Sequence, residues 1–174
     1  MNRAYGFVLP LAAAVLAPSL GFAVQVTAFG TFKAWSTYET GAGDGRVCYA
    51  LAKPTSTDPA KIKRDPAFVL INDWPARRAK AEPEIVPGFQ YKDGSSVTVQ
   101  LGSETVTFFT KNDGGTGGAW VEAQADEERL VNAMRTAPEM VVTGTSKRGT
   151  VVRDTYSLAG FGDALDKAQA ACGA

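Results

Sequence analysis

The sequence predicts a mainly β protein, a β-sandwich or barrel that carries two short accessory helices. Short β-rich runs recur along the chain at roughly even spacing, and turn-forming residues separate them. Helical periodicity occurs in two segments, both in the last third of the chain. The chain contains no glycine-loop βαβ unit and no repeat of fixed period, which removes the signs of a nucleotide-binding α/β fold and of a repeat architecture.

The first 23 residues predict a secretory signal peptide. Arg3 gives the segment a positively charged start, and an apolar run covers residues 7–17. Gly21 and Ala23 are small residues at the two positions that a signal peptidase recognises before its cleavage site. The run is shorter than the roughly 20 residues that span a bilayer, and no later stretch approaches that length. We therefore expect a signal peptide at residues 1–23, a mature chain that works outside the cytoplasm, and no transmembrane segment after cleavage.

The first part of the mature chain predicts a strand pair and a buried strand. Residues 29–39 alternate in part between two faces, the glycine-rich residues 41–45 form a turn, and residues 46–52 form the returning strand. Residues 54–66 are expected to be a polar loop. The continuous apolar run 67–71 is short and β-rich, which is typical of a central strand buried on both faces.

The middle of the chain predicts a loop, a hairpin and a short strand. Residues 74–83 contain two prolines and several cations, and we expect them to be irregular. Residues 97–101 and 105–109 alternate between apolar and polar side chains around a Gly-Ser turn, which makes this the clearest hairpin in the sequence. A glycine-rich loop at 112–118 leads into a short strand at 119–122.

The last third of the chain predicts two helices around a second hairpin. Residues 126–137 carry apolar side chains at i, i+4 and i+7 and acids in the first turn, and a proline follows them. Residues 140–144 and 150–158 form the hairpin. Residues 161–172 repeat the apolar spacing of one helix face, so a helix closes the chain.

The chain contains two cysteines, Cys48 and Cys172, near opposite ends of the mature sequence. In an oxidising compartment two cysteines of one small domain usually pair, so we expect a disulfide between them. Two separate buried thiols are the alternative. Because Cys172 lies on the apolar stripe of the closing helix, this bond would fasten that helix to the first strand pair.

Composition excludes several function classes. The chain contains no histidine, which rules out a Ser-His-Asp triad, a Cys-His pair and His-based zinc or copper sites. Two cysteines cannot form a four-thiolate metal site, and Asp44 and Asp113 lie in glycine-rich turns that lack the calcium-loop pattern. With 18 basic and 18 acidic residues the chain lacks the positive charge that nucleic acid requires. We expect no metal, no cofactor and no nucleic-acid partner.

Weak signals of an enzyme remain. The segment Gly144–Lys147 resembles a fragment of a Ser-Lys nucleophile site, although the usual Ser-x-x-Lys spacing is missing and a solvated turn is the simpler interpretation. Glu82 with Glu84, and Asp163 with Asp166, are carboxylate pairs of the kind that acid–base chemistry uses, but both pairs have the setting of surface acids. A periplasmic hydrolase with a carboxylate or Ser-Lys site is therefore the alternative function.

A basic and aromatic stretch is the candidate binding surface. Trp74 precedes a run of cations on a loop, and loops that combine aromatic and cationic side chains often bind partners. The hypothesis is that this surface binds an acidic partner of the cell envelope. The alternative is an ordinary solvent-exposed basic surface that has no partner. The candidate residues are Trp74, Arg77, Arg78 and Lys80, joined by Lys61, Lys63 and Arg64 if the two loops meet.

Several segments together carry a family resemblance. They are Phe29–Trp35, Val47–Ala50, Gly118–Val121, Gly144–Thr150, Asp154–Gly160 and the closing helix that ends in Cys172. In combination they resemble the invasion-associated locus B family of exported α-proteobacterial proteins, and the resemblance covers nearly all of the mature chain. The Thr-Tyr-Ser-Leu segment and the final cysteine are its most specific part.

The resemblance implies a fold, a location and a role. It implies one immunoglobulin-like β-sandwich domain over residues 24–174, located in the periplasm, with outer-membrane association or secretion as alternatives. It also implies an envelope role, linked in some pathogens to host-cell invasion, and no catalytic residues. We therefore expect a non-enzymatic protein that binds a protein or envelope component. An edge-strand binder is a third hypothesis, which requires an exposed, unpaired strand.

Overall fold

The structure, a computed structural model, describes residues 25–173, so the predicted signal peptide lies outside the described residues. The regular elements are β1 (Val26–Phe32), β2 (Trp35–Thr40), β3 (Val47–Ala52), β4 (Ser56–Asp58), β5 (Phe68–Trp74), β6 (Ala79–Val86), β7 (Ser96–Leu101), β8 (Glu104–Asp113), β9 (Thr116–Trp120), α1 (Gln124–Met134), β10 (Glu139–Thr145), β11 (Val151–Ser157) and α2 (Phe161–Cys172). Short 3-10 turns precede β3 and β6.

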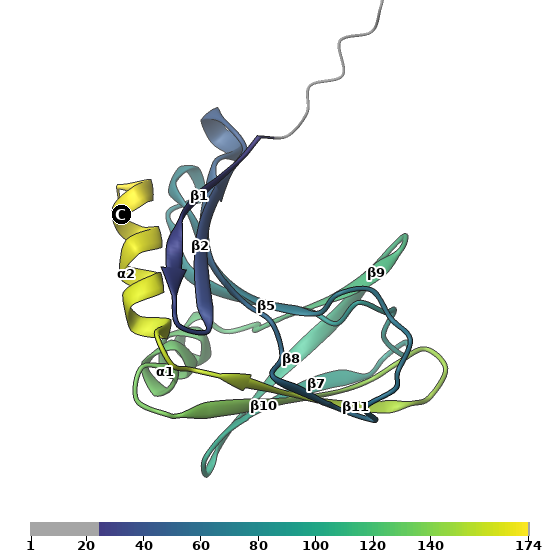
Figure 1. The fold of residues 1–174 in the computed structure, drawn as a ribbon. Coiled ribbons are helices and arrows are strands. Elements are labelled where there is room, and N and C mark those ends of the chain that lie inside the picture. Colours follow the sequence, from purple (N-terminus) through teal and green to yellow (C-terminus); the bar gives the residue numbers. More distant parts are fainter. Residues whose placement is uncertain (1–24, 174) are drawn as a thin grey trace, which may run out of the picture.

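Within residues 25–173 the eleven strands form one antiparallel sheet, in the order β1-β2-β3-β5-β6-β9-β8-β7-β10-β11-β4. The sheet folds over on itself, so that β5 lies above β7 and β10 in Figure 1. Apolar side chains of both layers and of α1 line the interior: Val69, Ile71, Ile85, Val99, Phe108, Leu130, Met134, Met140 and Val142. The predicted mainly β class with two helices is confirmed, and both layers belong to one continuous sheet.

The two hairpins with the clearest alternation form where the sequence predicts them. In β7 the side chains of Val97 and Val99 point into the core, whereas Thr98 and Gln100 are exposed. The β10–β11 pair keeps one register over its whole length. Both predicted helices form as well, and neither helix of the described residues has the length and apolar character of a membrane span.

Helix α2 packs against β1, β2 and β3 (Figure 1). The buried residues of its stripe are Phe161, Ala164, Leu165, Ala168 and Cys172. At its start the ring of Phe161 lies 4.9 Å from that of Trp35. At its end Cys172 forms a disulfide with Cys48, with the two Cα atoms 5.8 Å apart. The helix is therefore held to the sheet at both ends.

Helix α2 begins at a position where only glycine fits. Gly160 has φ of +85°, in the left-handed region, and a Cβ atom there would collide with the carbonyl of Phe32. Beside it the backbone N–H of Ala34 donates a hydrogen bond of 3.2 Å to the carbonyl of Ala159. The β1–β2 turn and the start of α2 consequently contact each other through their backbones.

Several local predictions were wrong. The predicted glycine-rich loop 112–118 is a turn of two residues between β8 and β9, which pair up to Asp113 and Thr116. Residues 29–39 do not form one strand, because the chain reverses at Lys33, which takes φ of +54° and separates β1 from β2. Residues 79–83 belong to β6 although the sequence predicts a loop, since they pair with β5. The predicted loop 54–66 contains β4, a strand of three residues that pairs with β11.

The two edges of the sheet are β1 and β4. The pairing of β1 with β2 shifts register between Ala28 and Gly30, where Phe29 forms a bulge. Bulges and very short strands are two ways in which proteins prevent an edge from pairing with another chain. Both edges of the described sheet therefore carry a feature that disfavours the edge-strand hypothesis.

Candidate functional site

The structure separates the predicted basic surface into two parts. Trp74 pairs with Ala79 at one end of β5, whereas Phe68 pairs with Val86 at the other end. Arg64 lies at that second end, where its Nη1 donates a hydrogen bond of 2.9 Å to the carbonyl of Pro87. A strand of seven residues extends over about 20 Å. The two loops therefore do not meet, and they do not form one surface.

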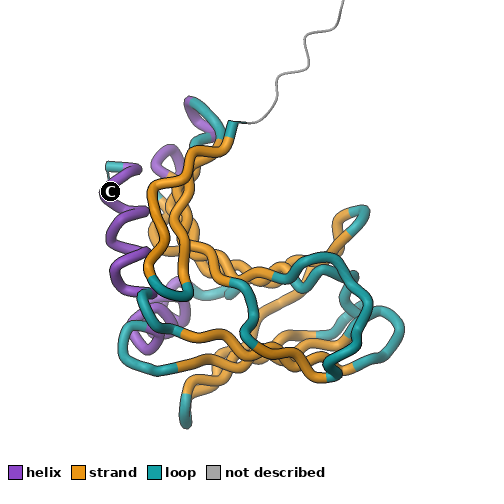
Figure 2. Tube along the Cα trace, in the orientation of Figure 1, coloured by secondary structure: helices purple, strands orange, loops and turns teal. Residues whose placement is uncertain are grey.

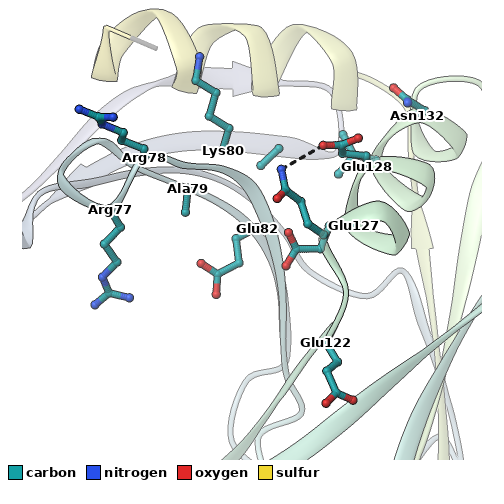
Figure 3. Close-up of a pocket in the computed structure, with 12 residues that line it drawn as sticks. Arg77, Arg78, Ala79, Lys80, Glu82, Glu122, Glu127, Glu128 and Asn132 are labelled. Atoms are coloured by element: carbon teal, nitrogen blue, oxygen red, sulfur yellow. Dashed lines mark hydrogen bonds between the residues drawn. The ribbon is translucent and has the colours of Figure 1, made fainter.

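The first part lies beside a groove of about 690 Å³ that has mixed charge. We call it the mixed groove, and its charged residues are Arg77, Arg78, Lys80, Glu82, Glu122, Glu127 and Glu128. Figure 3 shows the cations at one side of the groove and Glu127 and Glu128, on α1, at the other. The guanidinium of Arg77 also lies 4.5 Å from the centre of the Trp74 ring.

The glutamates weaken the attraction of the mixed groove for an acidic partner. Four carboxylates share the groove with three cations, so the opposite charges offset each other's field at the surface. Burial raises the pKa of the Glu127 carboxyl, and the neighbouring Glu82 and Glu128 raise it further. The groove thus contains a locally negative region, which the sequence hypothesis did not include.

Arg64 is a structural residue and is not available to a partner. Its side chain is 8% exposed and that of Asp154 is 7% exposed. Nη1 of Arg64 donates to Oδ2 of Asp154 at 2.7 Å, and Nη2 donates to Oγ1 of Thr57 at 3.0 Å. This buried ion pair fixes the segment between β4 and β5 against β11. The hypothesis that Arg64 joins a binding surface is therefore not supported by its position.

The second part of the predicted surface lies in a groove that is only basic. We call it the basic groove; its volume is about 610 Å³ and its lining residues are Lys61, Ile62, Lys63, Phe89, Gln90, Ser146, Lys147, Arg148 and Thr150. Four of these side chains are cationic and none is a carboxylate. The predicted residues Lys61 and Lys63 are both exposed there. Of the two grooves, this one has the charge that an acidic partner requires.

Backbone hydrogen bonds hold the two loops of the basic groove in place. The N–H of Lys147 donates to the carbonyl of Gln90 at 2.7 Å. The N–H of Ser146 donates to the carbonyl of Thr150 at 2.8 Å, which closes the β10–β11 turn. On the other side the N–H of Ile62 donates to the carbonyl of Pro59 at 3.2 Å. The cations therefore extend from ordered turns.

Of the residues that line the basic groove, the sequence hypothesis included only Lys61 and Lys63. Among those it missed, Phe89 adds an aromatic ring and Lys147 and Arg148 add two cations. The two cations at the tip of a predicted hairpin were the available signal. Their approach to Lys61 and Lys63 depends on the pairing of β11 with β4, which the sequence does not indicate.

The residues of the alternative enzyme hypothesis lie on three separate elements: Ser146 and Lys147 in the β10–β11 turn, Glu82 and Glu84 on β6, and Asp163 and Asp166 on α2. Ser146 Oγ accepts a hydrogen bond of 3.1 Å from the N–H of Thr150, and Lys147 Nζ lies 3.4 Å from the side-chain oxygen of Gln90. Asn72 donates to Glu84 at 3.0 Å, and burial raises the pKa of the Glu84 carboxyl. Among residues 25–173 no cluster of Asp, Glu and Cys side chains has a geometry suited to a metal ion.

Asp73 is a buried carboxylate that the sequence analysis did not single out. It is 1% exposed, and Oδ1 accepts a hydrogen bond of 3.0 Å from the N–H of Ala81. Oδ2 has no hydrogen-bond partner among the described residues. Burial raises the pKa of Asp73, an effect that the hydrogen bond from Ala81 and the charge of Lys80 partly offset. A buried carboxylate with one oxygen unpartnered is unfavourable when it is ionised.

Comparisons with known proteins agree with the fold. A family model described as "Invasion associated locus B (IalB) protein" matches residues 35–169. The crystal structure of invasion associated protein B from Bartonella henselae is similar, with a TM-score of 0.57 and 17% sequence identity. The match covers 83% of this chain and 98% of that chain. No curated protein matches the chain. At this identity the likeness to the solved structure shows the fold alone.

Proposed function

This chain belongs to the invasion associated locus B (IalB) family, and from that premise we propose that it is an exported, non-enzymatic protein of the bacterial cell envelope that binds an acidic envelope component. The binding surface is the basic groove. This proposal keeps Lys61 and Lys63 from the sequence hypothesis, adds Lys147 and Arg148, and sets aside the cations of the mixed groove.

The observation that carries the proposal is the absence of carboxylates among the residues that line the basic groove. Lys61, Lys63, Lys147 and Arg148 come from two loops that are far apart in the sequence, and the fold brings them to one groove. Like charges repel one another, so this arrangement raises the energy of the free protein unless an anion offsets it. A binding site for an anionic partner explains the arrangement.

Two further observations support an exported location. The N-terminal segment has the composition of a secretory signal peptide. The Cys48–Cys172 disulfide is a bond that persists in oxidising compartments and is rare in the cytosol. A periplasmic location, or association with the outer membrane from the periplasmic side, agrees with both.

The non-enzymatic part of the proposal is supported by the side chains that the hydrolase alternative requires. The Ser146 hydroxyl and the Lys147 ammonium belong to neighbouring residues of one turn, and each has a different hydrogen-bond partner. The carboxylates Asp166 and Glu84 are engaged by Arg135 and Asn72, respectively. A hydrolase needs such groups to converge on one reacting atom.

Fractionation of cells that export the full chain tests the proposal. The unmodified protein is expected in the envelope fraction, from which a salt wash releases it. A variant with Lys61→Glu, Lys63→Glu, Lys147→Glu and Arg148→Glu is expected in the soluble periplasmic fraction. The matched control is Arg77→Glu, Arg78→Glu and Lys80→Glu, which reverses the cations of the mixed groove and should leave the distribution unchanged.

Two outcomes would contradict the proposal. If the basic-groove variant stays with the envelope, the groove does not bind the component. If the control variant moves to the soluble fraction and the basic-groove variant does not, the cations beside Trp74 form the binding surface.

A further inference from the structure

We propose that the acidic component is a lipid bilayer, and that the basic groove docks against the phosphate groups of anionic lipids at its surface. This inference rests on the proposed function, because it names the partner of the same groove. Three observations support it: apolar side chains accompany the cations, the groove lies at an accessible end of the fold, and the basic groove differs in charge from the mixed groove.

Apolar side chains accompany the cations of the basic groove, within one loop and directly after the other. Ile62 lies between Lys61 and Lys63 and is partly exposed within the groove. Beside the second loop, Val151 is the first residue of β11 and follows Thr150, a lining residue. Val151 is 58% exposed, the highest value among the large apolar side chains of residues 25–173. Exposed aliphatic groups beside cations suit the boundary between phosphate headgroups and acyl chains.

An aromatic side chain adds to this apolar character. Phe89 lines the groove between the two loops and is partly exposed. Aromatic rings are favoured at the headgroup level of a bilayer, where their faces contact hydrocarbon. A small soluble anion would bind to the ammonium and guanidinium groups, but the side chains of Ile62, Phe89 and Val151 would stay exposed to water.

The groove is placed where a flat surface can reach it. The β10–β11 turn extends to the end of the molecule that lies away from α2, as Figures 1 and 2 show. The loop between β4 and β5 lines the same groove. At this end the chain forms loops and hairpin turns, and neither helix of the described residues covers it.

Charge separation would orient the protein on the bilayer. Glu127 and Glu128 lie on α1, at the helical end, whereas no carboxylate lines the basic groove. An anionic surface attracts the basic groove more strongly than the mixed groove, whose four carboxylates offset its three cations, so it favours the orientation that brings the loops to the lipid. Each cation near such a surface raises the partition coefficient by about fivefold at physiological salt.

Flotation with vesicles tests the inference on the purified mature chain, residues 24–174. The protein is expected to float with vesicles of phosphatidylcholine that contain phosphatidylglycerol, and to remain behind with vesicles of phosphatidylcholine alone. High salt should release it, since screening weakens the attraction. Replacing Lys61, Lys63, Lys147 and Arg148 by Gln should lower binding by more than a hundredfold, given about fivefold for each cation.

Two controls separate the lipid surface from other anions. The variant Val151→Ser keeps every charge and should weaken vesicle binding severalfold, whereas Arg77→Gln, Arg78→Gln and Lys80→Gln in combination should leave it unchanged. Soluble glycerophosphate at the same phosphate concentration should not displace the protein. Displacement by glycerophosphate, or an unchanged affinity of Val151→Ser, would overturn the lipid surface as the partner. Circular dichroism of each variant confirms that it is folded.

Failure of this inference is distinguishable from failure of the proposed function. If vesicles do not bind the protein but its envelope association in cells still depends on the basic groove, the inference is wrong and the component is an acidic protein or glycan. If envelope association also does not depend on the groove, both fail.

Discussion

Asp73 lies directly opposite Cys48 in the β3–β5 ladder, and its carbonyl oxygen is 3.9 Å from the sulfur of Cys172. The buried carboxylate and the disulfide that holds α2 therefore belong to one small region of the core. The carboxylate raises the energy of the folded state when it is ionised, and the disulfide lowers the entropy of the unfolded state. These opposite effects on stability lead to two separate measurements.

Asp73→Asn is expected to stabilise the protein at neutral pH. Burial raises the pKa of Asp73 in the folded state above its value in the unfolded chain. The contribution of the protonated Asp73 side chain to stability is therefore fully present below the unfolded-state pKa, and it is lost as the pH rises through the folded-state pKa. Asparagine has no charge to bury, so the free energy of unfolding in urea should rise by about 1 kcal/mol at pH 7. The gain should disappear near pH 3.5, close to the ordinary carboxyl range; an equal gain at both pH values would contradict this explanation.

Removal of the disulfide by Cys48→Ala with Cys172→Ala is expected to lower stability by about 2–4 kcal/mol. The bond closes a loop whose ends are 124 positions apart, so the unfolded chain gains considerable freedom without it. Thermal unfolding with and without a reductant measures the effect. The reductant should lower the melting temperature of the unmodified chain and leave that of the double variant unchanged.

The Arg64–Asp154 pair predicts strong and coupled effects. Either Arg64→Met or Asp154→Leu leaves one buried charge without its partner and should cost about 3–5 kcal/mol. The double variant should be less destabilised than the sum of the two, because no charge remains in the site. The control Lys61→Met, at an exposed position in the same loop, should change stability by less than about 0.5 kcal/mol. Urea unfolding of the four variants tests this, and simple additivity would contradict it.

Gly160→Ala is expected to be more damaging than Gly149→Ala, although both glycines have nearly the same φ, +85° and +86°. The strain of a left-handed backbone, about 1–2 kcal/mol, applies to both positions. At Gly149 nothing lies within 4 Å of the added Cβ, whereas at Gly160 it would collide with the backbone of Phe32. Melting temperatures of the two variants measure the difference. Equal losses would show that the contact between the β1–β2 turn and α2 is adaptable.

The sequence predicted those parts of the fold that depend on local signals. The β7–β8 and β10–β11 hairpins alternate clearly between apolar and polar residues, α2 carries an apolar stripe along its length, and α1 carries buried apolar residues in its second half. The turn at Lys33 was missed because lysine is an unusual residue for a left-handed φ, and no Asn or Gly marks it. The start of β6 was missed because its pairing with β5, and not its own residues, makes it a strand.

The candidate site was predictable only in part. Lys61, Lys63 and Arg64 look alike in the sequence, but the ion pair of Arg64 depends on Asp154, which is 90 positions away. The basic groove similarly depends on the β4–β11 pairing, which brings Lys147 and Arg148 to Lys61 and Lys63. Long-range pairings of this kind leave no local pattern, so charge runs alone could not show which cations are free and which are neutralised.

The bond between the third strand and the last helix makes most of the domain a covalent ring. A protease that cuts once, anywhere between Cys48 and Cys172, opens the backbone but leaves both pieces joined through the sulfur atoms. The nicked molecule keeps its mass on a gel without reductant, and separates into fragments only when the bond is reduced. A single cut within the ring therefore opens the backbone without the loss of a segment.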